Sequence, residues 1–433
     1  MNILSIIGVL LALCVLVYTS MKGWSVFISA PICAIIVAIT SRLGIFDTLM
    51  NTFMPGTTSF LAKWFLIFML GSVFGKIMEV SGAAFTISRV LLRLIGSRNA
   101  IAAVIISTGV LCYGGVSAGA VVFVVYPVAL ALFKEADLPK RLLPACIAIG
   151  AWGFATAALP GSPQMQNIIP TQYFGTTATA APVIGVICSV FIFVISLFYM
   201  NRRAKAAKLA GEHFVLTEKD ESSMNAVNYD DLPGLAVSLL PLVTLIVLII
   251  FLQWEVTRCL AAAVVLSVAL YYKRLNGKVR ETLNDGAFNS IGASMNTALT
   301  VGFTSVVSAS AAFSTLVAGL SRLTVGNPYV FECIAVNLLA GITGSASGGI
   351  SAALATFADT FLATGANPEV LHRIAAISAN GLDSMPYCGG VMTMLAVIGV
   401  THKESYWDIF MTTVVFNILG GVLAVILGTL GLC

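Results

Sequence analysis

The chain alternates long apolar stretches with short polar breaks. The stretches 3–19, 24–45, 235–252 and 409–432 each approach or exceed the length of about 20 residues that a helix needs to cross a lipid bilayer. The first stretch is not preceded by the basic residues that open a signal peptide. The pattern therefore predicts an all-α, polytopic membrane protein whose first stretch is a retained span.

Glycine and serine interrupt two of the apolar segments. YGGVSAGA (113–120) and TGSASGGI (343–350) lie in the middle of segments that are too long for one crossing. A helical hairpin that enters and leaves on the same face of the membrane fits this length. We expect such re-entrant hairpins at 100–133 and 328–362.

Prolines interrupt a second pair of segments. Pro160 and Pro163 lie in ALPGSPQMQNIIPT, and Pro386 lies in LDSMPYCGG. Proline has no N–H and clashes with the preceding turn, so an interior proline kinks or ends a helix. We expect broken helices at 142–173 and 370–400.

The four breaks recur at a nearly constant spacing. Tyr113 and Thr343 open the two Gly/Ser runs 230 residues apart, and Pro160 and Pro386 are 226 residues apart. This spacing predicts two related halves joined by a polar linker. Each half would have five transmembrane helices and one hairpin, so the second half crosses in the opposite direction, as an inverted repeat. The halves are 1–200 and 232–433, and the linker is 201–231.

The basic residues orient this topology. With the N-terminus outside and the linker inside, most of the 23 Lys and Arg residues fall on the cytoplasmic side, as the positive-inside rule requires. Arg373 is then assigned to the outer side, and no Lys or Arg is expected at the four breaks. Two amphipathic stretches, 85–96 and 274–286, are expected to lie along the cytoplasmic interface.

The breaks are the candidate binding site. In lipid, backbone outside a helix is tolerated only where it is buried in protein or lines a watery cavity. The ends of half-helices present partial charges that suit an anion or a cation. We therefore expect a small polar anion with several oxygens, such as a carboxylate, to bind there, against a polar lining of Tyr113, Gly114, Ser117, Thr156, Ser162, Gln164, Asn167, Thr343, Ser345, Ser347, Asn380, Ser384 and Tyr387.

Acidic residues within the membrane are candidates for coupling to an ion. Asp383 lies at a break without a predicted basic neighbour, which makes it the candidate carrier of a coupled proton. Capping of the half-helix that begins near Ser384 is the alternative role. Glu79 follows Lys76 by three residues and predicts an interfacial ion pair, and Glu332 is expected to reach water near the outer interface.

The composition agrees with a membrane protein and argues against catalysis. Of the 433 residues, 58% are hydrophobic and 10% are charged, against about 25% charged in soluble domains. The nine cysteines lack metal or redox spacing, the three histidines are isolated, and no nucleophile, zinc or nucleotide-binding motif occurs. We expect no enzyme activity, no cofactor, no metal site and no nucleic acid partner.

Three motifs carry a family resemblance. ALPGSPQMQNIIPT (158–171), LHRIAAISANGLDSMPYCGGV (371–391) and THKESYWDI (401–409) resemble the gluconate permease family of bacterial organic-acid:proton symporters. The second motif is more similar to the branch that carries 3-hydroxybutyrate than to the sugar-acid carriers. It departs from that branch at Tyr387 and Cys388, where a His is expected after the proline.

The resemblance implies a function and an architecture. It implies proton-coupled symport of a small hydroxylated organic acid anion, 3-hydroxybutyrate- or gluconate-like, across the bacterial cytoplasmic (inner) membrane. It also implies a homodimer in which hairpins and broken helices move like an elevator against a scaffold. A sodium-coupled carboxylate symporter is the alternative, with Asn380 or Thr343 binding the cation, and an anion channel is a further one.

Overall fold

The computed structural model describes residues 2–22, 24–225, 231–313, 315, 326–386 and 388–433. Tyr387, one of the predicted site residues, lies outside these residues. All regular secondary structure in the described residues is helical. Together with its apolar composition, this makes the chain a polytopic all-α membrane protein, as the hydropathy pattern predicts.

Helices in the first half follow the apolar stretches. Two of them are shorter than a membrane crossing and are separated by the Gly/Ser run, and another is interrupted at 159–164, around Pro160 and Pro163. The helices are α1 (Asn2–Met21), α2 (Val26–Thr40), α3 (Ile45–Thr48), α4 (Met54–Val80), α5 (Ala83–Ile95), α6 (Ala100–Tyr113), α7 (Ala120–Glu135), α8 (Leu143–Trp152), α9 (Met165–Phe174) and α10 (Pro182–Leu209).

The second half has a related order of helices after α11 (Glu218–Asn225). A glycine turn again separates two helices, and residues 380–386 and Cys388 again interrupt a third segment. These helices are α12 (Leu235–Ile250), α13 (Val256–Tyr271), α14 (Val279–Ser308), α16 (Pro328–Thr343), α17 (Ala346–Leu362), α18 (Pro368–Ala379), α19 (Gly389–Ile398), α20 (His402–Ile409) and α21 (Phe416–Thr429).

Length and apolar composition mark four continuous helical stretches of the described chain as able to cross a membrane. A fifth crossing results if the bent pair α5–α6, which turns by 94°, is one span. Six shorter apolar helices, of 10–17 residues, accompany them. The four long stretches are Ile45–Val80, Lys140–Ala158, Pro182–Leu209 and His402–Thr429.

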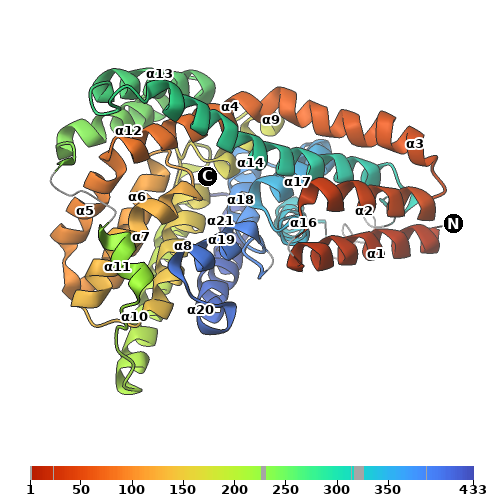
Figure 1. Cartoon of the computed structure of the whole chain (residues 1–433). Helices are drawn as coiled ribbons and strands as arrows, with labels where there is room; N and C mark the ends of the chain where they lie inside the picture. The colour runs from red at the N-terminus through yellow and green to blue at the C-terminus, as the bar shows by residue number, and fades with distance from the viewer. Residues whose placement is uncertain (1, 23, 226–230, 314, 316–325, 387) are drawn as a thin grey trace.

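The helices form a broad body with an arm. In Figure 1, α5 to α8 and α10 to α13 form the body, whereas α1, α2 and α3 extend away from it toward the N-terminus. The arm has a small core of its own, to which Val9, Val37, Phe53 and Phe303 belong. Helices α18, α19 and α21 lie between the arm and the body.

Helices α4 and α14 join the arm to the body along one antiparallel seam. Small residues allow the two backbones to approach closely. A Cβ atom on Gly286 would lie 2.6 Å from the Cα of Val73, and one on Gly302 would lie 2.7 Å from the carbonyl oxygen of Phe53. Figure 1 shows the pair running side by side across the molecule. This seam also forms one wall of the cavity described below.

The two amphipathic stretches form different structures. The first forms α5, which buries Ile87 and Leu92 and exposes Leu94. The second, 274–286, is not a separate helix, because residues from Val279 onward form the first turns of the 30-residue helix α14. The hydropathy pattern did not show this continuity because α14 contains several buried polar residues, among them Thr282, Ser294 and Thr297.

The polar linker docks onto the helices rather than remaining solvated throughout. Asp220 of α11 is buried and forms a 2.8 Å salt bridge with Lys140, and it also accepts a 2.6 Å hydrogen bond from Tyr126. Arg141 binds Glu212 at 2.6 Å. The linker is thus attached to the start of the α8 segment and to α7.

Candidate functional site

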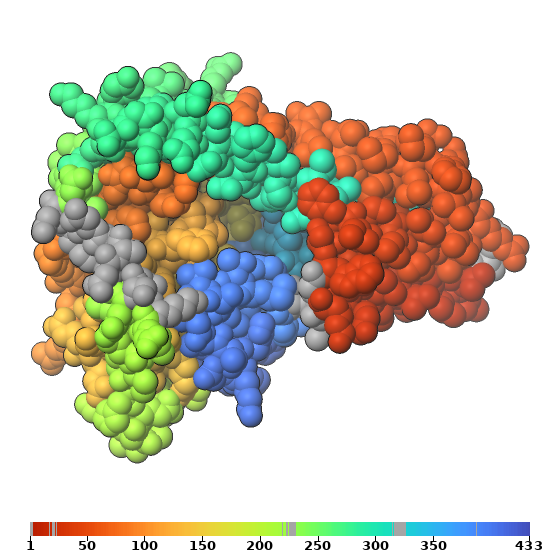
Figure 2. All heavy atoms as spheres, viewed as in Figure 1, coloured from red at the N-terminus to blue at the C-terminus, as the bar shows by residue number. Residues whose placement is uncertain are grey.

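A cavity of about 940 Å³ lies where both Gly/Ser turns, the first proline break and the α4–α14 seam meet. Figure 2 shows the surface hollowed between α14, in teal, and the blue C-terminal segment, with atoms of the first half deeper in the hollow. The cavity is at the upper end of the range of about 300–1,000 Å³ typical of small-molecule sites. A small ligand and several water molecules therefore fit inside it.

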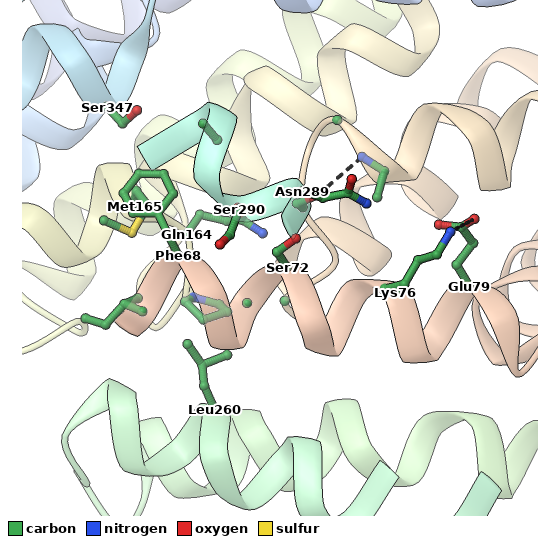
Figure 3. Close-up of a pocket in the computed structure, with 18 of the residues that line it drawn as sticks. Phe68, Ser72, Lys76, Glu79, Gln164, Met165, Leu260, Asn289, Ser290 and Ser347 are labelled. Atoms are coloured by element: carbon green, nitrogen blue, oxygen red, sulfur yellow. Dashed lines mark hydrogen bonds and ion pairs between the residues drawn. The ribbon is translucent and has the colours of Figure 1, made fainter. Parts of the chain in front are cut away.

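The cavity wall mixes apolar side chains with hydroxyls and amides. Three residues of the predicted site line it, namely Ser117, Gln164 and Ser347. Each comes from a different break, and Figure 3 shows Gln164 and Ser347 facing the same space as side chains of α4 and α14. The additional polar lining residues are Ser72, Lys76, Glu79, Gln166, Asn289, Ser290 and Thr393.

The first Gly/Ser turn is bonded to the first proline break. The hydroxyl of Tyr113 donates to the carbonyl oxygen of Pro160 at 2.7 Å. The side-chain nitrogen Nε2 of Gln164 donates to the carbonyl oxygens of Cys112 and Val116, at 2.7 and 3.0 Å. Backbone carbonyl oxygens of each break therefore accept hydrogen bonds from a side chain of the other, which helps to satisfy buried backbone.

Arg373 contradicts the expectation that no basic residue lies at the breaks. Its side chain, placed on the outer side by the sequence, is fully buried between the two halves. The guanidinium donates to Asn167 Oδ1 at 2.8 Å and to three carbonyl oxygens that flank the first break, those of Ala157, Ala178 and Ala180, at 2.6–3.4 Å. Within the described residues, no carboxylate forms an ion pair with it.

Asn167 belongs to the same hydrogen-bond network as Arg373. Its side-chain nitrogen donates to the carbonyl oxygens of Ser162 and Ala178, at 2.8 and 2.7 Å, and its oxygen accepts from Arg373. His372 lies within 3.3 Å of the same oxygen and within 2.7 Å of Thr176 Oγ1. Asn167 is fully buried and holds the break together, away from the cavity wall.

A second polar cluster connects the two broken segments. The side-chain nitrogen of Asn380 donates to Thr156 Oγ1 at 3.0 Å, and that of Asn417 donates to the carbonyl oxygen of Asn380 at 2.9 Å. The side-chain oxygens of Asn380 and Asn417 are buried and have no partner among the described residues. This cluster does not line the cavity.

Asp383 and Ser384 lie in the second break, and both are buried. Ser384 Oγ donates to Asp383 Oδ1 at 2.8 Å, and the Ser384 carbonyl oxygen accepts a 3.2 Å hydrogen bond from Tyr406. Neither residue belongs to the cavity wall. The prediction that Glu332 reaches water is wrong, because its side chain is fully buried in α16 with both carboxyl oxygens unpartnered among the described residues.

The remaining predicted residues shape the turns. Gly114 ends α6, where a Cβ would lie 2.3 Å from the side chain of Leu242. Ser345 caps α17 by accepting a hydrogen bond from the Gly348 nitrogen. Thr343 Oγ1 donates to the Ala340 and Ser345 carbonyl oxygens. Thr156 and Ser162 are buried in and beside the first break.

Sequence reasoning missed the contribution of α4 and α14 to the cavity. Lys76 and Glu79 form the predicted ion pair, at 3.2 Å, but the pair lines the cavity. Asn289 and Ser290 come from α14. The signal for α14 is its series of Asn, Ser and Thr residues, an unusual composition for a helix among apolar spans.

Comparison with known proteins decides the family. Residues 2–271 match the family model described as "GntP family permease". The chain belongs to the GntP permease family. The match confirms the resemblance carried by the proline motifs.

Relatives of this GntP permease are similar over much of their length. It is 34% identical over 455 residues to the uncharacterized transporter YxjC of Bacillus subtilis, covering 95% of this chain and 96% of that one. An uncharacterized transporter of Haemophilus influenzae is 24% identical, with 74% of each chain covered. The permease is therefore a multi-pass membrane transporter rather than an enzyme.

Proposed function

We propose that this GntP permease is a proton-coupled symporter of a small hydroxylated organic acid anion, 3-hydroxybutyrate- or gluconate-like. The observation that carries the proposal is the cavity bordered by both Gly/Ser turns and the first proline break. Hydroxyl and amide groups from Ser117, Gln164, Ser290 and Ser347 suit a ligand with several oxygens. Family membership supports a transported organic anion.

The proposed movement is of the elevator type. The helix pairs α6–α7 and α16–α17 would be re-entrant hairpins of an inverted repeat, and they would move with the two broken segments. Bonds between the hairpin turn and the first break support a common moving body, as do those of Arg373. The plain first spans of each half, α1 and α2 in the first and α12 and α13 in the second, would form the scaffold of a homodimer, with the N-terminus outside and the linker inside.

Asp383 is the proposed carrier of the coupled proton. It is the acidic residue of the second break and is buried, with Ser384 as its hydrogen-bond donor. The Asp383→Asn variant keeps a similar shape but cannot release a proton. We expect it to retain exchange of labelled for unlabelled substrate and to lose accumulation driven by a pH gradient. Accumulation at the wild-type level would assign Asp383 to capping alone.

Sodium coupling is the second candidate. The unpartnered side-chain oxygens of Asn380 and Asn417 are neutral oxygen ligands of the kind that bind hard cations. The positive charge of Arg373 disfavours a sodium ion at this cluster. Its guanidinium donates to the carbonyl oxygen of Ala157, and Ala157 follows Thr156, which bonds Asn380.

Proteoliposomes test both candidates. Purified permease is reconstituted, and uptake of labelled 3-hydroxybutyrate or gluconate is measured under an imposed pH gradient or an imposed sodium gradient of equal size. We expect accumulation with the pH gradient alone. Accumulation that requires sodium would replace the proton in the proposal, and uptake without exchange of labelled for unlabelled substrate would indicate a channel.

A further inference from the structure

The cavity has one basic and one acidic side chain in its wall. These are Lys76 and Glu79 of α4, which are bonded to each other at 3.2 Å. Figure 3 shows both side chains at one end of the cavity, pointing toward each other. Among the described residues that line the cavity, Lys76 is therefore the one fixed cation that a ligand can contact directly.

The ion pair is poorly shielded from the cavity. The side chains of Lys76 and Glu79 remain 23% and 30% exposed. Neither has another ion pair among the described residues. A partly exposed pair of this kind is weak, because both partners keep much of their hydration. Separating the two groups costs little if another carboxylate takes the place of Glu79.

We infer that Lys76 is the anion-recognition residue of this permease and that Glu79 is a resident competitor that the substrate carboxylate displaces. This inference rests on the proposed function, which supplies the carboxylate substrate. On binding, the substrate carboxylate takes the place of Glu79 beside the Lys76 ammonium group. The Glu79 carboxylate turns to the water of the cavity. No covalent bond changes, and Lys76 has a carboxylate partner in both states.

The cavity wall supports this exchange by holding the rest of the substrate. Ser72 lies one turn before Lys76 on α4. Ser290, which belongs to α14, faces Ser72 in Figure 3. Gln164 lies in the same view, in contact with the first hairpin turn. Serine and amide groups thus line the same cavity as Lys76 and are available to the hydroxyl groups of a substrate.

Charge-neutral variants separate a competitor from a structural partner. We expect Lys76→Gln to raise the KM for uptake by about tenfold or more, the effect of losing one charge-assisted contact. Glu79→Gln should lower the KM several-fold, because it leaves Lys76 free for the substrate. Lys76→Arg should stay near the wild type. These values are measured as concentration-dependent exchange of labelled 3-hydroxybutyrate and gluconate, supplied as potassium salts.

An exposed ion pair provides the matched control. Arg274 and Asp231 form a 3.4 Å pair that does not line the cavity. The variants Arg274→Gln and Asp231→Asn should leave the KM unchanged. Thermal unfolding of all variants in detergent reports any loss of folding separately from the loss of recognition.

Opposite signs for the two cavity variants would support the inference. If Lys76→Gln and Glu79→Gln changed the KM in the same direction, and the double variant restored it, the pair would be structural and the inference wrong. Unchanged KM values in both would also overturn it. Failure of the proposed function has a different signature, because the wild type itself would then exchange neither acid. In that case, the rise in unfolding temperature caused by added 3-hydroxybutyrate or gluconate is compared across the same variants.

Discussion

At the scale of single residues, Arg373 has the most demanding environment of the described side chains. A buried guanidinium is expensive to desolvate unless its donors are satisfied. Here it is satisfied by neutral oxygens, three of them backbone carbonyls on the two sides of the first break. One side chain of the second half thereby determines the geometry of a break in the first half.

Replacing Arg373 should therefore destabilise the protein strongly. Arg373→Gln is too short to reach the same acceptors, and each buried acceptor that loses its donor costs about 1–3 kcal/mol. We expect a total loss of at least about 3 kcal/mol, measured as a lower midpoint of thermal unfolding in detergent. The control is the exposed Arg274, whose replacement by Gln should have little effect. An unchanged midpoint for Arg373→Gln would show that these bonds contribute little.

The docked linker predicts a dependence on pH. Burial alone would raise the pKa of Asp220, but hydrogen bonds from Lys140, Tyr126 and Thr217 outweigh it and hold the pKa below the ordinary 3.8. The hydrogen bond from Arg141 lowers the pKa of Glu212 below 4.5. Groups with lowered pKa values stabilise the docked form above their ordinary pKa. This stabilisation is lost as the pH falls through the lowered values.

Hydrogen exchange measures this loss. Protection of the amides in 212–225, corrected for intrinsic exchange rates, should be constant near neutral pH and should fall below about pH 4. Asp220→Asn should reduce protection already at neutral pH. Glu221→Gln, an exposed residue of the same helix, is the matched control. Protection that increased on acidification would contradict the sign of both pKa shifts.

At the scale of helices, the α4–α14 seam depends on glycine at defined positions. Gly286 faces the backbone of Val73, whereas Gly292 of the same helix has open space around its Cα. Gly286→Ala should therefore cost about 1–3 kcal/mol through overpacking. Gly292→Ala should be neutral or stabilising by up to about 1 kcal/mol, since alanine favours the helix. Thermal unfolding of the two variants compares them directly, and equal midpoints would show that the seam adjusts without cost.

Local sequence patterns predicted elements better than contacts between them. The hydropathy pattern and the prolines identified the apolar helices and the interruptions near Pro160 and Pro386, because these depend on local backbone chemistry. The sequence did not place Arg373 between the halves, since a lone arginine near the start of an apolar helix also fits an interface. It did not place Lys76 in the cavity wall for a similar reason, because an i,i+3 ion pair is common on exposed helix surfaces.

At the scale of the whole molecule, the cavity depends on residues far apart in the chain. Ser117, Gln164 and Ser347 were predicted because each lies at a break, while Asn289 and Ser290 lie in an uninterrupted helix. The packing of α14 against α4 brings Asn289 and Ser290 to the same cavity as the residues of the breaks. A cavity lined by residues far apart in the chain is therefore specified by packing that local patterns do not report.

The length of one helical stretch has a consequence for the surrounding lipid. Residues Ile45–Val80 form a continuous stretch of 36 residues, which corresponds to about 54 Å. The hydrocarbon layer is only about 30 Å thick, so this rod must lie steeply oblique or extend into the headgroups. Since α14 is packed along it, we expect a change in acyl-chain length to alter the tilt of both helices. We therefore expect the thickness of the bilayer to affect the geometry of the cavity that α4 and α14 border.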